Sequence, residues 1–319
     1  MNGTVERMNR VDSSGALKSE QRVKSPAEGP AGPTWPLVLL FLFALTVLGW
    51  TYLAAMIADM VPAMDMTEAG PGMGLFNQFN LFDGLSAQAR AALAALCLPS
   101  QVATFGMPSQ SWTIVDVARV FLMWAMMTFA MMIPSIVPMV RTFLKRSTNN
   151  GKSVSRAQFG ALLLVAGYVT VWLAYAVAVT ALQWLLTLEG ILTQMMAPVS
   201  LAFSASVLIA AGIYQLTPAK YACLQRCWYP RFNLAGPQTT FRSFHEGVIQ
   251  GLACLGCCWA VMAVMFAVGL MNVIWVAILG VMIAVEKMII NNWIRYALGV
   301  FLLAWGAGLA ALATGGVQL

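Results

Sequence analysis

Long apolar stretches alternate with short polar breaks along most of the chain. Seven of these stretches approach or exceed the roughly 20 helical residues needed to cross about 30 Å of hydrocarbon. They cover about residues 35–57, 116–140, 159–184, 199–216, 247–268, 273–290 and 293–313. The pattern predicts an all-α fold, a polytopic transmembrane helix bundle of about seven spans.

Two polar segments lie outside these stretches. Residues 1–34 end in SPAEGPAGPT, and the apolar stretch that follows has no A-x-A-like cleavage signal, so we expect a disordered arm and an uncleaved anchor. Residues 59–111 form a long connection in which SAQARAALAALCL has the pattern of a short amphipathic helix at the membrane interface. The predicted organisation is a cytoplasmic arm over 1–34 and one membrane domain over 35–319.

The composition strengthens the membrane assignment. Hydrophobic residues make up 60% of the 319 residues, charged residues make up 9%, and the mean hydropathy is +0.76. A soluble domain is about half apolar and about a quarter charged. The lipid bilayer is therefore the expected partner of this chain, and no nucleic-acid partner is expected from the net charge of +6.

The positive charges fall in alternate connections, which predicts the topology. They lie in the N-terminal arm and after the second, fourth and sixth apolar stretches: Arg7, Arg10, Lys18, Arg22, Lys24, Arg141, Lys145, Arg146, Lys152, Arg156, Lys220, Arg226, Arg231, Arg242, Lys287 and Arg295. The opposite connections hold only Arg90 and Arg119 as positive residues. Because positive loops stay on the cytoplasmic side, we expect a multi-pass inner (plasma) membrane protein with its N-terminus inside, its C-terminus outside and 59–111 extracytoplasmic.

A cysteine-rich segment, CLGCCW, lies in the fifth apolar stretch at residues 254–259. At about 100° per residue, Cys254, Cys257 and Cys258 share one arc of a helix with Glu246 and Gln250. Polar groups on a membrane helix face the bundle interior, because exposure to lipid costs several kcal/mol. The segment is therefore expected in the cytoplasmic half of the membrane, with its sulfur atoms pointing inward.

Two further cysteines and two glycines extend this picture. Cys223 and Cys227 follow the fourth apolar stretch and share one face if that segment is helical. Gly247 and Gly251 form a G-x-x-x-G step that allows close helix contact. Only Cys97 lies on the outer side, without a cysteine partner there, so we expect reduced thiols rather than a structural disulfide.

Three other kinds of side chain join the candidate set. Met127 and Met131 belong to a methionine ladder in the second apolar stretch, where Pro134 and Pro138 are expected to interrupt the backbone hydrogen-bond ladder of the helix. Glu286 is an acid near the cytoplasmic end of the sixth stretch, and such an acid is either a ligand or proton site or the partner of a cation. His245 is the only histidine, so a histidine-rich site is excluded.

Thiolate and thioether sulfur are soft donors that suit Cu(I), with Zn(II) as the alternative if His245 or Glu286 takes part. The candidate metal ligands are Cys223, Cys227, Cys254, Cys257, Cys258, Met127, Met131, His245 and Glu286. The competing interpretation is structural, since buried cysteine packs as a small hydrophobe and methionine is common in apolar helices. Both interpretations remain open at the level of the sequence.

The motifs resemble those of a family of unknown function described as predicted metal-binding integral membrane proteins. The resemblance covers about residues 115–287 and is carried by MWAMMTFAMMIPSIVPM at 123–139, YQLTPAKYACLQRC at 214–227 and the segment from His245 to Lys287. It implies a metal site at the cysteines named above, at Met126, Met127, Met131 and Met132, and at Glu286. It does not indicate which metal.

The expected function is binding of a soft transition metal, most simply copper, for transport or for delivery between a metal chaperone and a membrane cuproenzyme. Two alternatives remain: a membrane thiol–disulfide oxidoreductase that uses Cys254 and Cys257, and a structural subunit of a larger membrane complex. The chain has no P-loop, Rossmann glycine motif or HExxH motif. ATP-driven pumping and ordinary hydrolase chemistry are therefore unsupported, and an enzyme is not the favoured interpretation.

Overall fold

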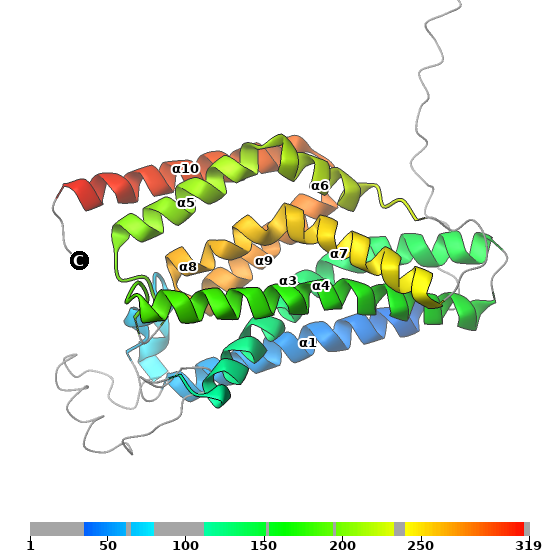
Figure 1. Ribbon diagram of the computed structural model, residues 1–319, viewed down its shortest axis with the longest axis horizontal. Helices are drawn as coiled ribbons and strands as arrows, with labels where there is room; N and C mark the ends of the chain where they lie inside the picture. The colour runs from blue at the N-terminus through cyan, green and yellow to red at the C-terminus, as the bar shows by residue number, and fades with distance from the viewer. Residues whose placement is uncertain are drawn as a thin grey trace, which may run out of the picture. The chain divides into compact units, whose positions relative to one another are not determined.

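The computed structural model describes residues 35–61, 65–79, 112–150, 153–193, 196–232 and 240–315. Helices make up almost all of this part of the chain, and the residues described contain no strand beyond one isolated bridge between Leu192 and Pro198. The elements are α1 (Trp35–Met60), η1 (Met66–Ala69), η2 (Met73–Phe79), α3 (Ile114–Asn149), α4 (Val154–Leu188), α5 (Leu201–Leu216), α6 (Pro218–Trp228), α7 (Thr240–Ala263), α8 (Met265–Val268), α9 (Val273–Met288) and α10 (Asn292–Thr314) (Figure 1). The predicted all-α class is confirmed.

Five helices are long and apolar enough to cross a membrane, namely α1, α3, α4, α10 and α7 together with α8. A sixth candidate is α5 with α6, two helices joined through a bend of 63°. Helix α9 has 16 residues, fewer than the roughly 20 of a full span, although its sequence is strongly apolar. Five of the seven predicted spans are thus found as long helices, a sixth is bent, and the seven-span topology stays a prediction.

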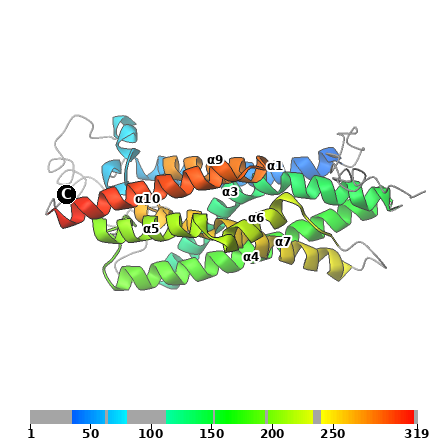
Figure 2. The same cartoon turned by 90° about the horizontal axis from the view of Figure 1, so that it is seen from above.

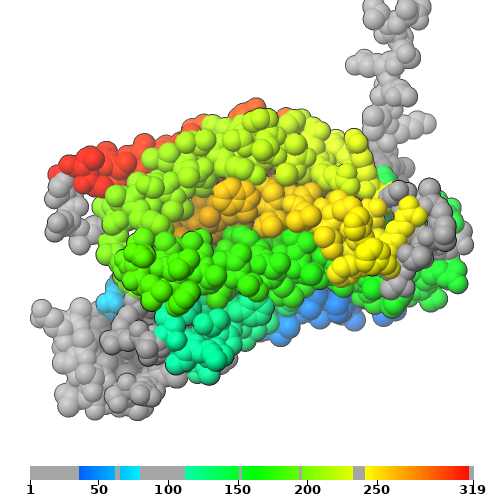
Figure 3. All heavy atoms as spheres, viewed as in Figure 1, coloured from blue at the N-terminus to red at the C-terminus, as the bar shows by residue number. Residues whose placement is uncertain are grey.

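The helices pack as neighbouring pairs. Helix α1 lies along α3, α4 lies along α7, and α5 lies along α10, while α9 packs on α3 (Figures 1 and 2). In the space-filling view, the atoms of α7 to α9 lie between those of α4 and those of α5 (Figure 3). The cysteine-bearing helix therefore occupies the middle of the bundle.

Glycines explain how α7 comes so close to α4. A Cβ atom at Gly247 would lie 2.1 Å from the carbonyl oxygen of Leu164, and one at Gly251 would lie 2.9 Å from a side-chain carbon of Val171. On the other helix, a Cβ atom at Gly167 would lie 2.1 Å from the carbonyl oxygen of Phe244. The close contact predicted from the G-x-x-x-G step is confirmed.

Most of the described basic residues lie towards one end of the bundle, called the basic end here, where α3 ends and α4 and α7 begin (Figure 1). Arg146 links two of its segments, donating to the carbonyl of Pro230 and lying over the ring of Phe232. At the opposite end, Arg119 is the only described lysine or arginine. The basic residues that predicted the topology are therefore also concentrated towards one end of the folded bundle. The side of the membrane that each end faces remains a prediction.

Some expectations from the sequence differ from the structure, and others concern residues that the structure does not describe. Helix α3 contains Pro134 and Pro138 and continues to Asn149, beyond the predicted end of the span near residue 140. Nearby hydroxyls add side-chain bonds to this part of the helix, since Ser135 donates to the carbonyl of Met132 and Thr142 to that of Pro138. The predicted disordered arm, the amphipathic segment at 86–98 and Cys97 lie outside the described residues.

Candidate metal centre

The three cysteines of α7 form a compact sulfur group. Their Sγ atoms all lie within 4.8 Å of one another, and each residue is at most 2% exposed. The Sγ atoms of Cys257 and Cys258 are 3.2 Å apart, and the Cys257 thiol donates to the carbonyl oxygen of Cys254 over 3.1 Å. The spacing of three and four residues places all three on one face of the helix, as the sequence predicted.

Helix α6 adds a fourth sulfur atom to this group. Its start is set by Thr217, whose side chain accepts from the backbone N–H of Lys220, and by Pro218 in the first turn. The helix crosses α7 so that the Sγ atom of Cys227 lies 3.8 Å from that of Cys257. We call Cys227, Cys254, Cys257 and Cys258 the thiol cluster.

Cys223 also faces α7, one turn before Cys227 on α6. A Cβ atom at Gly256 would lie 2.6 Å from the Cys223 Sγ atom, so the missing side chain of Gly256 makes room for this sulfur. Cys223 is only partly buried, which distinguishes it from the three cysteines of α7. It therefore lies at the edge of the thiol cluster, on the side of α6.

A network of polar side chains from three other helices reaches the Sγ atom of Cys254. The hydroxyl of Tyr168 on α4 lies 2.8 Å from this sulfur, and the ammonium of Lys287 on α9 donates to it over 2.8 Å. The same ammonium donates to the hydroxyl of Ser135 on α3 over 2.9 Å. Four helices thus meet at Cys254, and Lys287 is a functional candidate that the sequence analysis assigned only to the topology.

Glu286 is held by a different network, adjacent to the cluster. Its carboxylate forms an ion pair with Lys220 over 2.8 Å, and Gln215 donates to its other oxygen over 3.4 Å. Lys220 also donates to the side chain of Gln215, and all three residues are at most 1% exposed. This network fastens α6 to α9, and Glu286 is not part of the sulfur group.

Of the remaining predicted ligands, His245 lies apart from the thiol cluster, and Met127 and Met131 belong to the apolar core. His245 is exposed and stacks on Phe241 one turn earlier, and at about 1.5 Å per residue it lies about 13 Å along α7 from Cys254. Met127 and Met131 are at most 2% exposed, and Met131 packs on α9, where a Cβ atom at Gly280 would lie 3.3 Å from its Cγ. The structure therefore brings together four of the nine predicted ligands.

The donor set fits one soft ion. Two sulfur atoms bound to the same ion at about 2.3 Å lie at most about 4.6 Å apart, close to the separations in the thiol cluster. Thiolate sulfur selects Cu(I) and also suits Zn(II), whereas harder divalent ions prefer oxygen ligands. A group of four thiols, three of them buried, beside an ammonium group is therefore a candidate centre for a soft cation.

A family model described as PpoB2, copper chaperone, matches residues 121–309 of the chain. The chain belongs to this copper chaperone family. The matched segment contains every described cysteine and every helix that contributes to the thiol cluster. No curated protein and no solved structure matches the chain.

The family match bears on the resemblance drawn from the motifs. It supports a metal-related family over residues 121–309, which overlap the residues 115–287 of the resemblance, under a different family description. Two contributors to the centre were not proposed as site residues from the sequence, namely Tyr168 and Lys287. An aromatic residue in one apolar run and a lysine at the edge of another carry no motif, so only their contacts with Cys254 reveal them.

Proposed function

We propose that this copper chaperone binds Cu(I) in the thiol cluster, within the membrane, and passes it on to an acceptor. The observation that carries the proposal is the convergence of four sulfur atoms, three of them buried, from two helices. Cu(I) is the ion that soft thiolate ligands favour, and it accepts fewer ligands than the four that structural Zn(II) takes. Zn(II) is the competing ion.

The charge near the cluster supports a monovalent ion. A Cu(I) ion held by two thiolates carries one net negative charge, which is costly in the low-dielectric interior of a membrane protein. The ammonium of Lys287 contacts Cys254 and offsets that charge. A Zn(II) ion on four thiolates would leave one negative charge uncompensated even with Lys287 present.

The arrangement of sulfur supports movement of the ion along the bundle. With the basic end on the cytoplasmic side, the partly buried Cys223 and Cys227 of α6 receive the ion first, and the buried cysteines of α7 hold it next. Met131 and Met127 continue along α3 towards the opposite end, and they offer weaker thioether ligands. Successive weak sites allow an ion both to enter and to leave, as transport or delivery requires. The donor and the acceptor are then a metal chaperone and a membrane cuproenzyme.

Metal analysis of purified protein tests this proposal. Protein purified in detergent from copper-supplemented cells is expected to carry stoichiometric copper, and a Cys254→Ser, Cys257→Ser double variant is expected to lose it. Cys97→Ser is the matched control, because it makes the same chemical change at the sixth cysteine. Wild-type protein without copper, or a double variant that keeps its copper, would overturn the proposal.

The same variants separate the two alternatives. A thiol–disulfide oxidoreductase requires that alkylation of Cys254 and Cys257 change with the redox potential of the buffer. A structural subunit requires that the double variant behave like wild type in cells. Neither result is expected of a copper-binding centre with reduced thiols.

A further inference from the structure

The loop between α4 and α5 buries a methionine in an unusual backbone conformation. The loop closes on itself through the bridge between Leu192 and Pro198 and through a bond of 2.8 Å from the N–H of Thr193 to the carbonyl of Ala197. Met196 has a φ of 55°, and it is the only non-glycine residue with a positive φ in the described part of the chain. Its exposure is nevertheless 1%. A left-handed methionine costs about 1–2 kcal/mol, so the surrounding structure must hold it in place.

A buried chain of hydrogen bonds fixes the sulfur atom of Met196. The amide of Gln183 on α4 donates to the Met196 Sδ atom over 2.7 Å, while the amide oxygen of Gln183 accepts from the indole N–H of Trp124 over 2.8 Å. An indole N–H can only donate, so the amide oxygen must face Trp124 and its NH₂ group must face the sulfur. Gln183 is completely buried. The interior thus positions one particular thioether with two polar side chains.

Other methionines lie at the same end of the bundle. The N–H of Leu270 donates to the carbonyl of Met196, and a Cβ atom at Gly269 would lie 2.3 Å from the carbonyl oxygen of Ala69. These contacts join the loop, the turn after α8 and the end of η1. Each connecting segment here contributes at least one methionine that is at most 1% exposed: Met66, Met73, Met196, Met265 and Met271.

A column of buried thioethers connects this region to the thiol cluster. Trp124 directly follows Met123 on α3, and Met127, Met131 and Ser135 succeed Met123 at steps of four residues on the same face. Ser135 accepts from the same ammonium that contacts Cys254. At about 1.5 Å per residue, the column from Ser135 to Trp124 is about 16 Å long.

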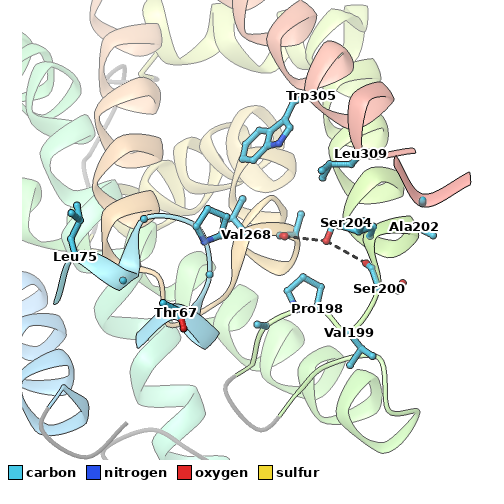
Figure 4. Close-up of a pocket in the computed structure, with 18 residues that line it drawn as sticks. Thr67, Leu75, Pro198, Val199, Ser200, Ala202, Ser204, Val268, Trp305 and Leu309 are labelled. Atoms are coloured by element: carbon cyan, nitrogen blue, oxygen red, sulfur yellow. Dashed lines mark hydrogen bonds between the residues drawn. The ribbon is translucent and has the colours of Figure 1, made fainter. Parts of the chain in front are cut away.

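A large cavity lies beside the loop residues that follow Met196. It has a volume of about 1120 Å³, and its wall includes Ala197 and Pro198, the two residues that follow Met196. Val268 of α8 and Trp305 and Leu309 of α10 lie on other sides of it (Figure 4). Its lining has no charged side chain. An ion that leaves Met196 therefore has a space beside it that a partner can reach without meeting a competing charge.

We propose that Met196 is the central ligand of a second soft-cation site, from which Cu(I) leaves the protein at the end opposite the basic end. The proposal rests on the proposed function for its direction of flow, while the site itself stands on the geometry above. A thioether is a neutral and weaker donor than a thiolate, so an ion bound at Met196 exchanges faster than one in the thiol cluster. The amide of Gln183 occupies one lone pair of the sulfur and leaves the other for the cation.

Silver titration of the detergent-solubilised protein tests the site, because Ag(I) has the same charge and preference for sulfur as Cu(I) and is redox-inert. The methionine methyl groups are labelled with ¹³C and followed by NMR. In wild type, the first silver fills the thiol cluster, and silver added afterwards is expected to shift the Met196 methyl resonance. The Met196 resonance is assigned as the signal that is missing from the spectrum of Met196→Leu. If this variant does not fold, the resonance is assigned as the signal that is displaced in the spectrum of Gln183→Leu. A Met196 signal that does not move after the thiols are filled overturns the proposal.

Two further arms separate this proposal from the proposed function. Met196→Leu is expected to keep the silver capacity of the thiol cluster and to lose at least tenfold in affinity for the later silver. Met288→Leu, at a methionine that is 67% exposed, is the matched control and is expected to change neither. If silver shifts Met196 but never reaches the thiols, the proposed function fails and the second site stands. If silver fills the thiols and Met196→Leu binds like wild type, the second site fails alone.

Discussion

Replacement of Lys287 by methionine removes the positive charge beside the thiol cluster while keeping a side chain of similar length. The Lys287 Nζ atom lies 2.8 Å from the Cys254 Sγ atom, so the net negative charge of a Cu(I) ion bound by two thiolates lies about 4 Å from the positive ammonium. Two unit charges at about 4 Å interact by about 4 kcal/mol at an effective dielectric constant near 20. Lys287 keeps some exposure to solvent, so we take about half of this value, or about 2 kcal/mol. That energy corresponds to about a 30-fold loss of Cu(I) affinity.

Competition with a chromogenic Cu(I) chelator in detergent measures this loss. Lys287→Arg is expected to keep most of the affinity because it retains the charge. Lys145→Met removes an exposed lysine from the same end of the bundle and serves as the control. A Lys287→Met protein whose Cu(I) affinity stays within threefold of wild type would show that charge balance by this lysine is not part of copper binding.

Three further predictions concern the packing that builds the centre. Lys220→Met leaves the buried carboxylate of Glu286 unpaired and is expected to destabilise the protein by about 3–5 kcal/mol, whereas the Lys220→Met, Glu286→Gln double variant recovers most of this in thermal unfolding. Equal melting temperatures for the single and double variants would contradict the ion pair. Gly247→Ala places a Cβ atom 2.1 Å from a backbone oxygen of α4, and it is expected to lower the melting temperature more than Gly308→Ala, where no atom lies within 4 Å. Gly256→Ala brings a Cβ atom within 2.6 Å of the Cys223 sulfur, so faster alkylation of that cysteine is the expected readout, and an unchanged rate would argue against the contact.

Much of the candidate centre was accessible from the sequence because it depends on local periodicity. Cys254, Cys257 and Cys258 share a helical face by their spacing alone, and the G-x-x-x-G step at Gly247 and Gly251 predicts a close neighbour for the same helix. Both expectations are confirmed. The helical character of the segment that carries Cys223 and Cys227 is confirmed as well.

The structure separates two of the predicted ligands from the sulfur group. His245 and Glu286 carry suitable donor atoms, yet neither joins that group. His245 lies about 13 Å away along the same helix. Glu286 is buried among Lys220 and Gln215, because a buried carboxylate needs a charged partner and the lysine of α6 is within reach. The position of a residue along a helix does not specify the direction in which its side chain points around the helix axis.

The sequence by itself determined the helical class, the apolar stretches, the alternating charge and the sulfur-rich face of α7, since each follows from the residues of a single segment and the helical repeat. Only the tertiary structure decided that Cys227 joins the cysteines of α7, that Lys287 and Tyr168 contact Cys254, and that Met196 points inward beside a cavity. These contacts join residues far apart in the chain. These contacts depend on the direction in which α6 leaves its 63° bend and on the rotation of each helix about its axis. Both result from packing among many side chains at once.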